Sequence, residues 1–173
     1  FISNSDYIDG SDLVDKHDNV IMLRTFSKLH GLASLRLGWG YCSEYILSNL
    51  MKVRGPFSVN TAAILAGIAA IEDIEFQKKS VLHNTKWMGW FEKELEALDL
   101  DFQTSVTNFL LIKFPNKNLK SAQNAEKFLA DKGILVRGMS AYGLSNYLRV
   151  SIGNEEENII FIKELKKFLD NQK

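Results

Sequence analysis

Short continuous apolar runs and apolar residues at helical spacing alternate along the first half of the chain. Residues 20–23 are consecutive β-branched and apolar positions, which predicts a strand buried on both faces, and residues 37–41 predict its partner strand. A polar, acidic segment with a turn signal at Gly10 comes first and predicts one short helical turn around Leu13. Three helices are predicted next, the second of them buried: residues 44–53, 61–73 and 74–98.

After Leu100 the pattern changes to short units of strand and helix. The predicted elements are a strand at 109–114, a helix at 122–132 that Gly133 ends, strands at 134–137 and 148–152, and a helix at 155–169. This order is typical of a small α+β domain. Because the helix at 74–98 is long enough to connect two domains, we place the domain boundary within it, between residues 85 and 86.

Charge and cysteine content exclude several classes of function. Lys+Arg and Asp+Glu number 21 each, so no global field favours nucleic acid or an anionic membrane surface. Cys42 is the single cysteine, which excludes an internal disulfide and fits a reducing compartment. No apolar run approaches the roughly 18 residues of a membrane span, and no metal-ligand spacing is present. We therefore expect a cytoplasmic protein without metal, nucleic-acid or membrane partners.

The segment between the two predicted strands carries the densest chemistry. Thr25, Ser27 and Lys28 follow the first strand directly, and Gly31 and Arg36 precede the second. Hydroxyl groups and a guanidinium are donors that suit phosphate. A lysine amine at a strand end can form a Schiff base or act as a point charge on phosphate. A lone loop lysine is usually a surface residue. The neighbouring phosphate donors Thr25, Ser27 and Arg36 are what favour an anion site with a reactive amine here.

The pattern S-K-x-x-G-L-A-x-L-R-x-G, which begins at Ser27, resembles the lysine motif of fold-type I aminotransferases that depend on pyridoxal 5'-phosphate. The resemblance implies that Lys28 is the catalytic residue and binds the cofactor as a Schiff base. It also implies that Ser27 and Arg36, the arginine eight positions after the lysine, hold the cofactor phosphate. Thr25 would be a further phosphate neighbour.

Other segments narrow the resemblance to the histidinol-phosphate aminotransferase subfamily. They are R-T-F-S-K from Arg24, R-G-P-F-S-V-N from Arg54, N-F-L-L from Asn108, G-I-L-V-R ending at Arg137, and L-R-V-S-I-G around Arg149. The similarity covers essentially the whole chain. It implies an α/β fold, with the end of a large cofactor-binding domain at 1–85 and a small C-terminal α+β domain at 86–173. It further implies amino transfer between histidinol phosphate and 2-oxoglutarate in histidine biosynthesis, by a homodimer.

The resemblance assigns the acidic end of the substrate to arginines. Arg149 would bind the carboxylate of glutamate or the phosphate of histidinol phosphate, and Arg137 would be a second anion contact. An arginine in an apolar strand is costly to bury unless an anion pairs with it, although an edge strand facing solvent accounts for Arg149 as well. Asn108 either orients the substrate or caps a turn. Tyr142 either lines the substrate entrance or packs on its own loop.

The resemblance also implies residues that precede this chain. They are an Asp that pairs with the pyridine nitrogen and a Tyr at the ring hydroxyl, and Phe1 is not assigned to the tyrosine position. We therefore expect the C-terminal half of a longer enzyme, inactive alone. Three alternatives stay open: an aromatic amino acid aminotransferase, a threonine-phosphate decarboxylase of the same fold, and a non-catalytic sensor domain that resembles an aminotransferase.

Overall fold

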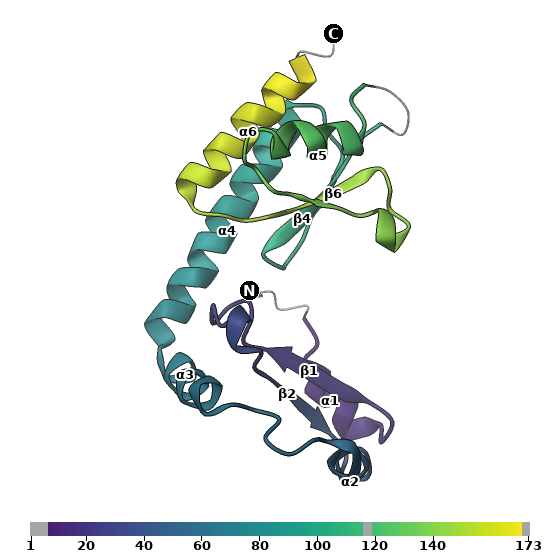
Figure 1. The fold of residues 1–173 in the computed structure, drawn as a ribbon, viewed down its shortest axis with the longest axis vertical. Helices are drawn as coiled ribbons and strands as arrows, with labels where there is room; N and C mark the ends of the chain where they lie inside the picture. Colours follow the sequence, from purple (N-terminus) through teal and green to yellow (C-terminus); the bar gives the residue numbers. More distant parts are fainter. Residues whose placement is uncertain (1–6, 116–118, 171–173) are drawn as a thin grey trace. The chain divides into compact units, whose positions relative to one another are not determined.

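The chain divides into two compact units that meet inside one helix. A computed structural model describes residues 7–115 and 119–170. One unit covers residues 2–81 and the other residues 82–173 (Figure 1). The division falls within helix α4 (Ile74–Ala97), a few residues before the boundary expected from the sequence. The assignment of the two units to a large and a small domain stays a prediction, and Phe1 lies outside the described residues.

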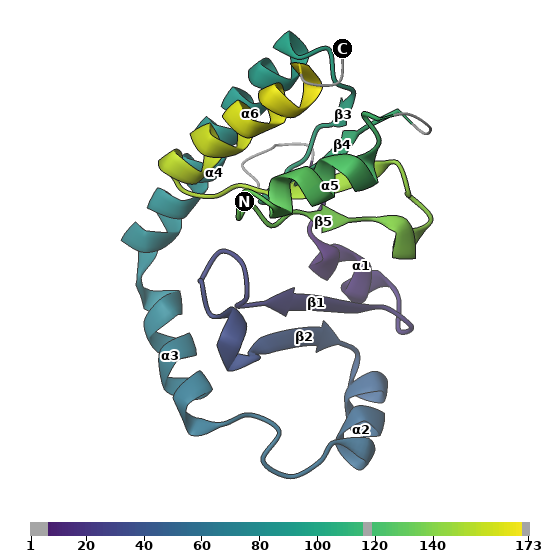
Figure 2. The ribbon, with the colours of Figure 1, turned by 45° about the horizontal axis from the view of Figure 1, so that its top comes forward.

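A two-stranded antiparallel hairpin forms the centre of the first unit. Strands β1 (Ile21–Thr25) and β2 (Gly38–Cys42) pair in a register that sets Thr25 opposite Gly38 (Figure 2). A Cβ at Gly38 would lie 2.7 Å from the carbonyl oxygen of Arg24, so only glycine fits at this strand end. The predicted strand pair is confirmed, with each strand shifted by one or two residues, as is usual for element ends.

Helix α1 (Gly10–Lys16) forms where one short helical turn was predicted, and polar contacts tie it to the hairpin. Asp9 caps the helix by accepting a hydrogen bond from the backbone N–H of Ser11. The hydroxyl of Tyr41 donates to the carboxylate of Asp15 at 2.6 Å, and this bond raises the pKa of Tyr41. Because these groups are exposed, they orient α1 more than they stabilise it.

Burial on both faces of the first strand was predicted and is wrong for the described structure. Exposed and half-buried positions alternate along β1, and Leu23 is 71% exposed. Helix α3 (Thr61–Glu72) was likewise expected to be buried, but only Ala63 and Gly67 are, while Leu65 is 64% exposed. A run of apolar residues indicates that both faces of an element would gain from burial. Whether they are buried depends on which other elements pack against them.

The helices of the first unit begin and end as their capping residues dictate. Helix α2 (Glu44–Val53) is capped by Ser43, and Asn60 caps α3 with its side chain 2.8 Å from the N–H of Ala63. A Cβ at Gly67 would lie 2.5 Å from Leu37, so the glycine lets α3 approach the hairpin closely.

The second unit is a four-stranded antiparallel sheet with helices on one face. The strand order among the described residues is β3 (Phe102–Gln103), β4 (Phe109–Lys113), β6 (Tyr147–Ser151), β5 (Arg137–Gly138). Helices α4, α5 (Ala122–Ala130) and α6 (Glu155–Asp170) contribute to a single core with the sheet, and α4 runs beside α6 (Figures 1 and 2).

Strict alternation along β4 and β6 decides which face is buried. Leu110 and Ile112 of β4, with Leu148 and Val150 of β6, are nearly inaccessible and pack against the helices. Each such side chain contributes about 1.5–3 kcal/mol on burial. Phe91 of α4 is fully buried and belongs to this core. The intervening residues face away from the helices and leave one side of the sheet open.

The strand predicted at 134–137 forms only at its end. Residue Ile134 is tied to the preceding helix, because its N–H donates to the carbonyl of Leu129 at 2.9 Å. Gly133 takes a positive φ of 77° at that helix end. The segment therefore diverges from β6 until Arg137. Strand β3 was not predicted, because two residues are too few to show the alternation of apolar and polar positions that marks a strand.

Gly38→Ala is expected to lower the free energy of unfolding of the full-length protein by about 1–3 kcal/mol, because its methyl group would overlap the backbone of Arg24. Urea unfolding measures the loss. Gly89→Ala is the control, since nothing lies within 4 Å of its Cβ in α4 and a helical Gly→Ala change is stabilising. Equal behaviour of the two variants would contradict the close approach at Gly38.

Candidate functional site

The loop between β1 and β2, residues 26–37, is closed at its base by backbone hydrogen bonds. The N–H of Phe26 donates to the carbonyl of Leu37 at 3.1 Å, which extends the hairpin ladder beyond Thr25 and Gly38. The N–H of Leu32 donates to the carbonyl of Phe26 at 2.9 Å. Phe26 is 6% exposed and lies under α3 near Gly67. We call residues 26–37 the lysine loop.

Closure of the base sets the backbones of Ser27 and Arg36 on facing sides of the loop, next to the closing hydrogen bond. Ser27 follows one partner of the closing hydrogen bond and Arg36 precedes the other. The N–H of Ser27 donates to the hydroxyl oxygen of Thr25 at 3.0 Å, so Thr25 shapes the same turn. Arg36 takes a left-handed φ of 54°, which is uncommon without a glycine. Its guanidinium donates to the carbonyl of Ala33 at 2.7 Å. Two hydroxyl groups and an oriented guanidinium are thereby gathered at one base, as anion binding requires.

Lys28 projects from this base. Its side chain is exposed, and within residues 7–115 and 119–170 it forms no ion pair. Gly31 closes a turn by donating its N–H to the carbonyl of Lys28 at 3.0 Å, with a φ of 68°. The lysine amine therefore stands on a backbone that is fixed on both sides. A lysine amine next to phosphate donors is suited to form a covalent bond with the aldehyde of a phosphorylated ligand.

A second cluster lies on the open face of the sheet in the other unit. Arg137 of β5 and Arg149 of β6 are directly opposed in the antiparallel register, and Leu111 of β4 lies opposite Arg149 on its other side. Directly opposed residues share a face, so both guanidinium groups project to the same side. Like charges at opposed positions repel each other. We call these two residues the arginine pair, and an anion bound to both would offset this repulsion.

Each member of the arginine pair rests on an aromatic ring. The guanidinium carbon of Arg149 lies 4.9 Å from the ring centre of Phe109, and its buried Nε has no hydrogen-bond partner among the described residues. Arg137 donates a hydrogen bond to the hydroxyl of Tyr142 at 3.3 Å. Both arginines line a cavity of about 600 Å³ that continues along Ser151. In the described part of the chain, neither arginine has an acidic partner.

The structure does not bring Asn108 to the arginine pair. Asn108 immediately precedes β4, and its carbonyl accepts the N–H of Ile152 at 2.9 Å. By strand alternation its side chain lies on the helix-covered side, whereas Phe109 and Arg149 lie on the open side. The buried amide of Asn84 donates to the neighbouring carbonyl of Thr107 at 3.0 Å. A role of Asn108 in substrate binding stays a prediction.

Two residues beside the arginine pair, Phe109 and Tyr142, were not assigned a role from the sequence. Phe109 was counted only as a strand residue, and both readings of Tyr142 were left open. Their roles follow from the strand register, which sets Arg137 opposite Arg149. No pattern in the sequence shows that register, so the roles could not be predicted.

Features of other classes of protein are absent from the described residues. Among residues 7–115 and 119–170, no three His, Cys, Asp or Glu side chains are grouped as a metal ion would require. No helix of the described part has the length and apolar character that crossing a lipid bilayer requires.

A lysine loop at a hairpin end, followed by an α+β unit with an arginine pair, defines a transaminase-type protein. The chain belongs to the aminotransferase class I and II family, whose model matches residues 1–165. The resemblance found in the sequence is thereby confirmed, and so are the fold class and the family of enzymes.

Individual relatives are consistent with this family. The histidinol-phosphate aminotransferase of Maricaulis maris (strain MCS10) is 46% identical over 169 residues, which cover 98% of this chain and 47% of the relative. The crystal structure of a putative histidinol-phosphate aminotransferase from Erwinia carotovora atroseptica has a TM-score of 0.88 at 22% identity and covers 98% of this chain and 48% of that one. It shows the fold alone.

A third relative carries a cofactor. The histidinol-phosphate aminotransferase from Sinorhizobium meliloti, solved in complex with pyridoxal-5'-phosphate, has a TM-score of 0.80 at 25% identity, covering 89% of this chain and 42% of that one. The present chain thus spans about half the length of the relatives that it matches.

Proposed function

We propose that the protein containing this chain transfers an amino group between histidinol phosphate and 2-oxoglutarate, as a step of histidine biosynthesis. The single observation that carries the proposal is the identity of 46% and 44% to curated histidinol-phosphate aminotransferases over 98% of the chain. The lysine loop and the arginine pair supply chemistry that this reaction needs, namely a reactive amine and a binding site for an acidic substrate end.

The cofactor in this proposal is pyridoxal 5'-phosphate, and the residues of the lysine loop fit it. The Lys28 amine would hold the cofactor covalently through its aldehyde carbon. Arg36 and Ser27, adjacent at the loop base, would hold the phosphate, with Thr25 shaping the turn. When bound, the cofactor supplies an electron-withdrawing ring that makes the substrate Cα–H acidic.

Lys28 has a second task once the substrate amine has displaced it. Its free amine would take the proton from the substrate carbon and return it to the neighbouring cofactor carbon. A base that acts on two adjacent atoms must stay within reach of both. Gly31 and the Thr25–Ser27 contact hold the backbone on either side of Lys28 and so fix the point from which the side chain extends.

The arginine pair would hold the acidic end of each substrate. Arg149, half-buried and stacked on Phe109, has an unpaired Nε that an anionic oxygen would satisfy. Its planar fork suits a carboxylate as well as a phosphate. Arg137 adds a second positive charge on the same face. Two arginines match the dianionic phosphate of histidinol phosphate, and Arg149 alone matches the carboxylate of glutamate.

The assembly and location of the protein stay proposals. We infer a homodimer from the family resemblance, and a cytoplasmic location from the reducing compartment that fits Cys42. In the same way, the isolated 173-residue chain is expected to be inactive, because the resemblance places the partner of the pyridine nitrogen outside it.

Borohydride reduction of the full-length protein loaded with pyridoxal 5'-phosphate is expected to label Lys28, because its amine bonds to the aldehyde. Peptide mass mapping locates the label, and Lys28→Ala should abolish it together with the visible absorbance. Lys52→Ala, on helix α2, should keep both, since that amine lies outside the lysine loop and donates to the side chain of Asn49. A label on another lysine in the unsubstituted protein would refute the role of Lys28.

Turnover is expected with histidinol phosphate as the amino donor, at a kcat/KM at least tenfold above that with phenylalanine, because the arginine pair matches a dianion. Steady-state rates with each amine and 2-oxoglutarate measure this. Release of carbon dioxide from threonine phosphate is assayed in parallel. No transfer from histidinol phosphate, with activity on either other compound, would assign the protein to another branch of the fold.

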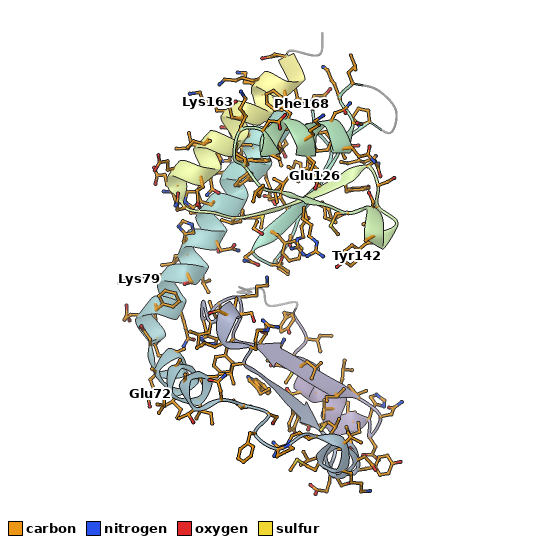
Figure 3. The ribbon with its side chains drawn as sticks, in the orientation of Figure 1. Glu72, Lys79, Glu126, Tyr142, Lys163 and Phe168 are labelled. Atoms are coloured by element: carbon orange, nitrogen blue, oxygen red, sulfur yellow. The ribbon has the colours of Figure 1, made fainter. Side chains whose placement is uncertain are left out.

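Arg149→Ala is expected to raise KM for histidinol phosphate and for glutamate by about 10–100-fold, since a charged hydrogen bond contributes about 1.5–3 kcal/mol. Retention of the cofactor, followed by its absorbance after gel filtration, should not change. Lys163→Ala is the matched control, because this exposed cation, labelled in Figure 3, lies on helix α6 and not on the strands that carry the arginine pair. Loss of the cofactor with unchanged KM would contradict the assignment.

A further inference from the structure

We propose that Tyr142 is a positioning residue that fixes Arg137 and thereby sets the preference of the arginine pair for a phosphate over a carboxylate. The inference rests on the proposed function, because it takes the substrates to be histidinol phosphate and glutamate. Tyr142 does not touch the substrate in this proposal. It acts through the guanidinium of Arg137.

Arg137 needs an external restraint. It is exposed, it lies at the two-residue edge strand β5, and it faces the like charge of Arg149 directly across the register. A long side chain at such a place loses rotamer freedom when it is ordered, and repulsion drives it away from its neighbour. The side-chain contacts found for Arg137 among the described residues are all with Tyr142.

Tyr142 holds Arg137 in two ways. Its hydroxyl oxygen accepts a hydrogen bond from Nη2 of Arg137 at 3.3 Å, and the guanidinium carbon lies 5.7 Å from the ring centre. The second distance is within the range of a cation–π interaction. The phenol therefore offers a polar and an aromatic restraint to one guanidinium.

The backbone beneath Tyr142 is a hydrogen-bonded turn. Tyr142 ends a short 3₁₀ helix, η2 (Ser140–Tyr142), in the loop between β5 and β6, where Figure 3 labels it. Its N–H donates to the carbonyl of Met139 at 3.0 Å, and Met139 is 8% exposed. Gly143, with a φ of 75°, closes the turn by donating its N–H to Ser140 at 3.0 Å. The ring thus stands on a fixed turn, although its side chain is 60% exposed.

The two arginines are held by different partners, and this difference gives selectivity. Phe109 supports Arg149 with a hydrocarbon ring that accepts no conventional hydrogen bond, so this support occupies none of the N–H groups of that guanidinium. Arg149 can satisfy a carboxylate by itself through its planar fork. A phosphate has three terminal oxygens and up to two charges, so it gains from a second cation held in place. Loss of Tyr142 should therefore weaken phosphate binding and leave carboxylate binding intact.

Simple packing does not account for the geometry of Tyr142. A residue that serves packing buries its ring, as Phe91 does at 0% exposed, whereas the Tyr142 ring is largely in solvent. Removing an exposed ring costs little apolar burial. Its effect on substrate selection is thus separable from stability.

The test uses the full-length protein loaded with cofactor and measures kcat and KM for histidinol phosphate and for glutamate. Tyr142→Leu should raise KM for histidinol phosphate about five- to tenfold, change KM for glutamate less than twofold, and leave kcat near its original value. Tyr142→Phe keeps the ring and loses the hydroxyl, so it should show a smaller rise in KM for histidinol phosphate. Tyr45→Leu, an exposed tyrosine of α2 in the other unit, is the matched control and should change neither KM.

Equal rises in both KM values, or no rise for histidinol phosphate, would overturn the proposal. If Tyr142→Leu lowers the thermal midpoint, Tyr142→Phe decides the question, because it preserves the volume of the ring. Failure of the unsubstituted protein to use histidinol phosphate is a different result. It would refute the proposed function, whereas normal activity with unaltered selectivity in the variants would refute only the role of Tyr142.

Discussion

The hydrogen bond from the N–H of Phe26 to the carbonyl of Leu37 is the constraint on which the lysine loop depends. It extends the β1–β2 ladder by one step and so fixes where the loop begins and ends. Ser27 and Arg36 are adjacent because they flank this bond, and Lys28 is fixed because Ser27 is. The bond is itself sheltered, since Phe26 is buried beneath α3 and Gly67 allows that helix to approach. A glycine about forty positions away in the sequence thus supports the chemistry at Lys28.

The arginine pair depends on a different kind of constraint. Strict alternation in β4 and β6 buries Leu110, Ile112, Leu148 and Val150 against three helices, and the same alternation leaves Arg149 on the open face. The hydrophobic core therefore orients the charged face. Opposed arginines that form no ion pair within the described residues repel each other in the absence of an anion. Such repulsion is a common mark of a binding site, because the ligand supplies the missing charge.

Much of the fold was predicted from patterns that act over short distances. Helices α2, α3, α4 and α6 were predicted within one residue at each end, because apolar spacing and caps such as Asn60 are local signals. The short strand β3, the late start of β5 and the exposure of Leu23 and Leu65 were not predicted, because pairing and burial depend on elements far along the chain.

The sequence by itself determined the chemistry of the lysine loop and the family. Ser27, Lys28 and Arg36 lie within ten residues of each other. Their order and spacing are therefore visible in the sequence alone, and they match a family motif. Only the tertiary structure decided that Arg137 lies opposite Arg149, and that Phe109 and Tyr142 support the two guanidinium groups. The physical reason is register. A shift of one residue in strand pairing would exchange the two faces of β6 while leaving every sequence motif unchanged.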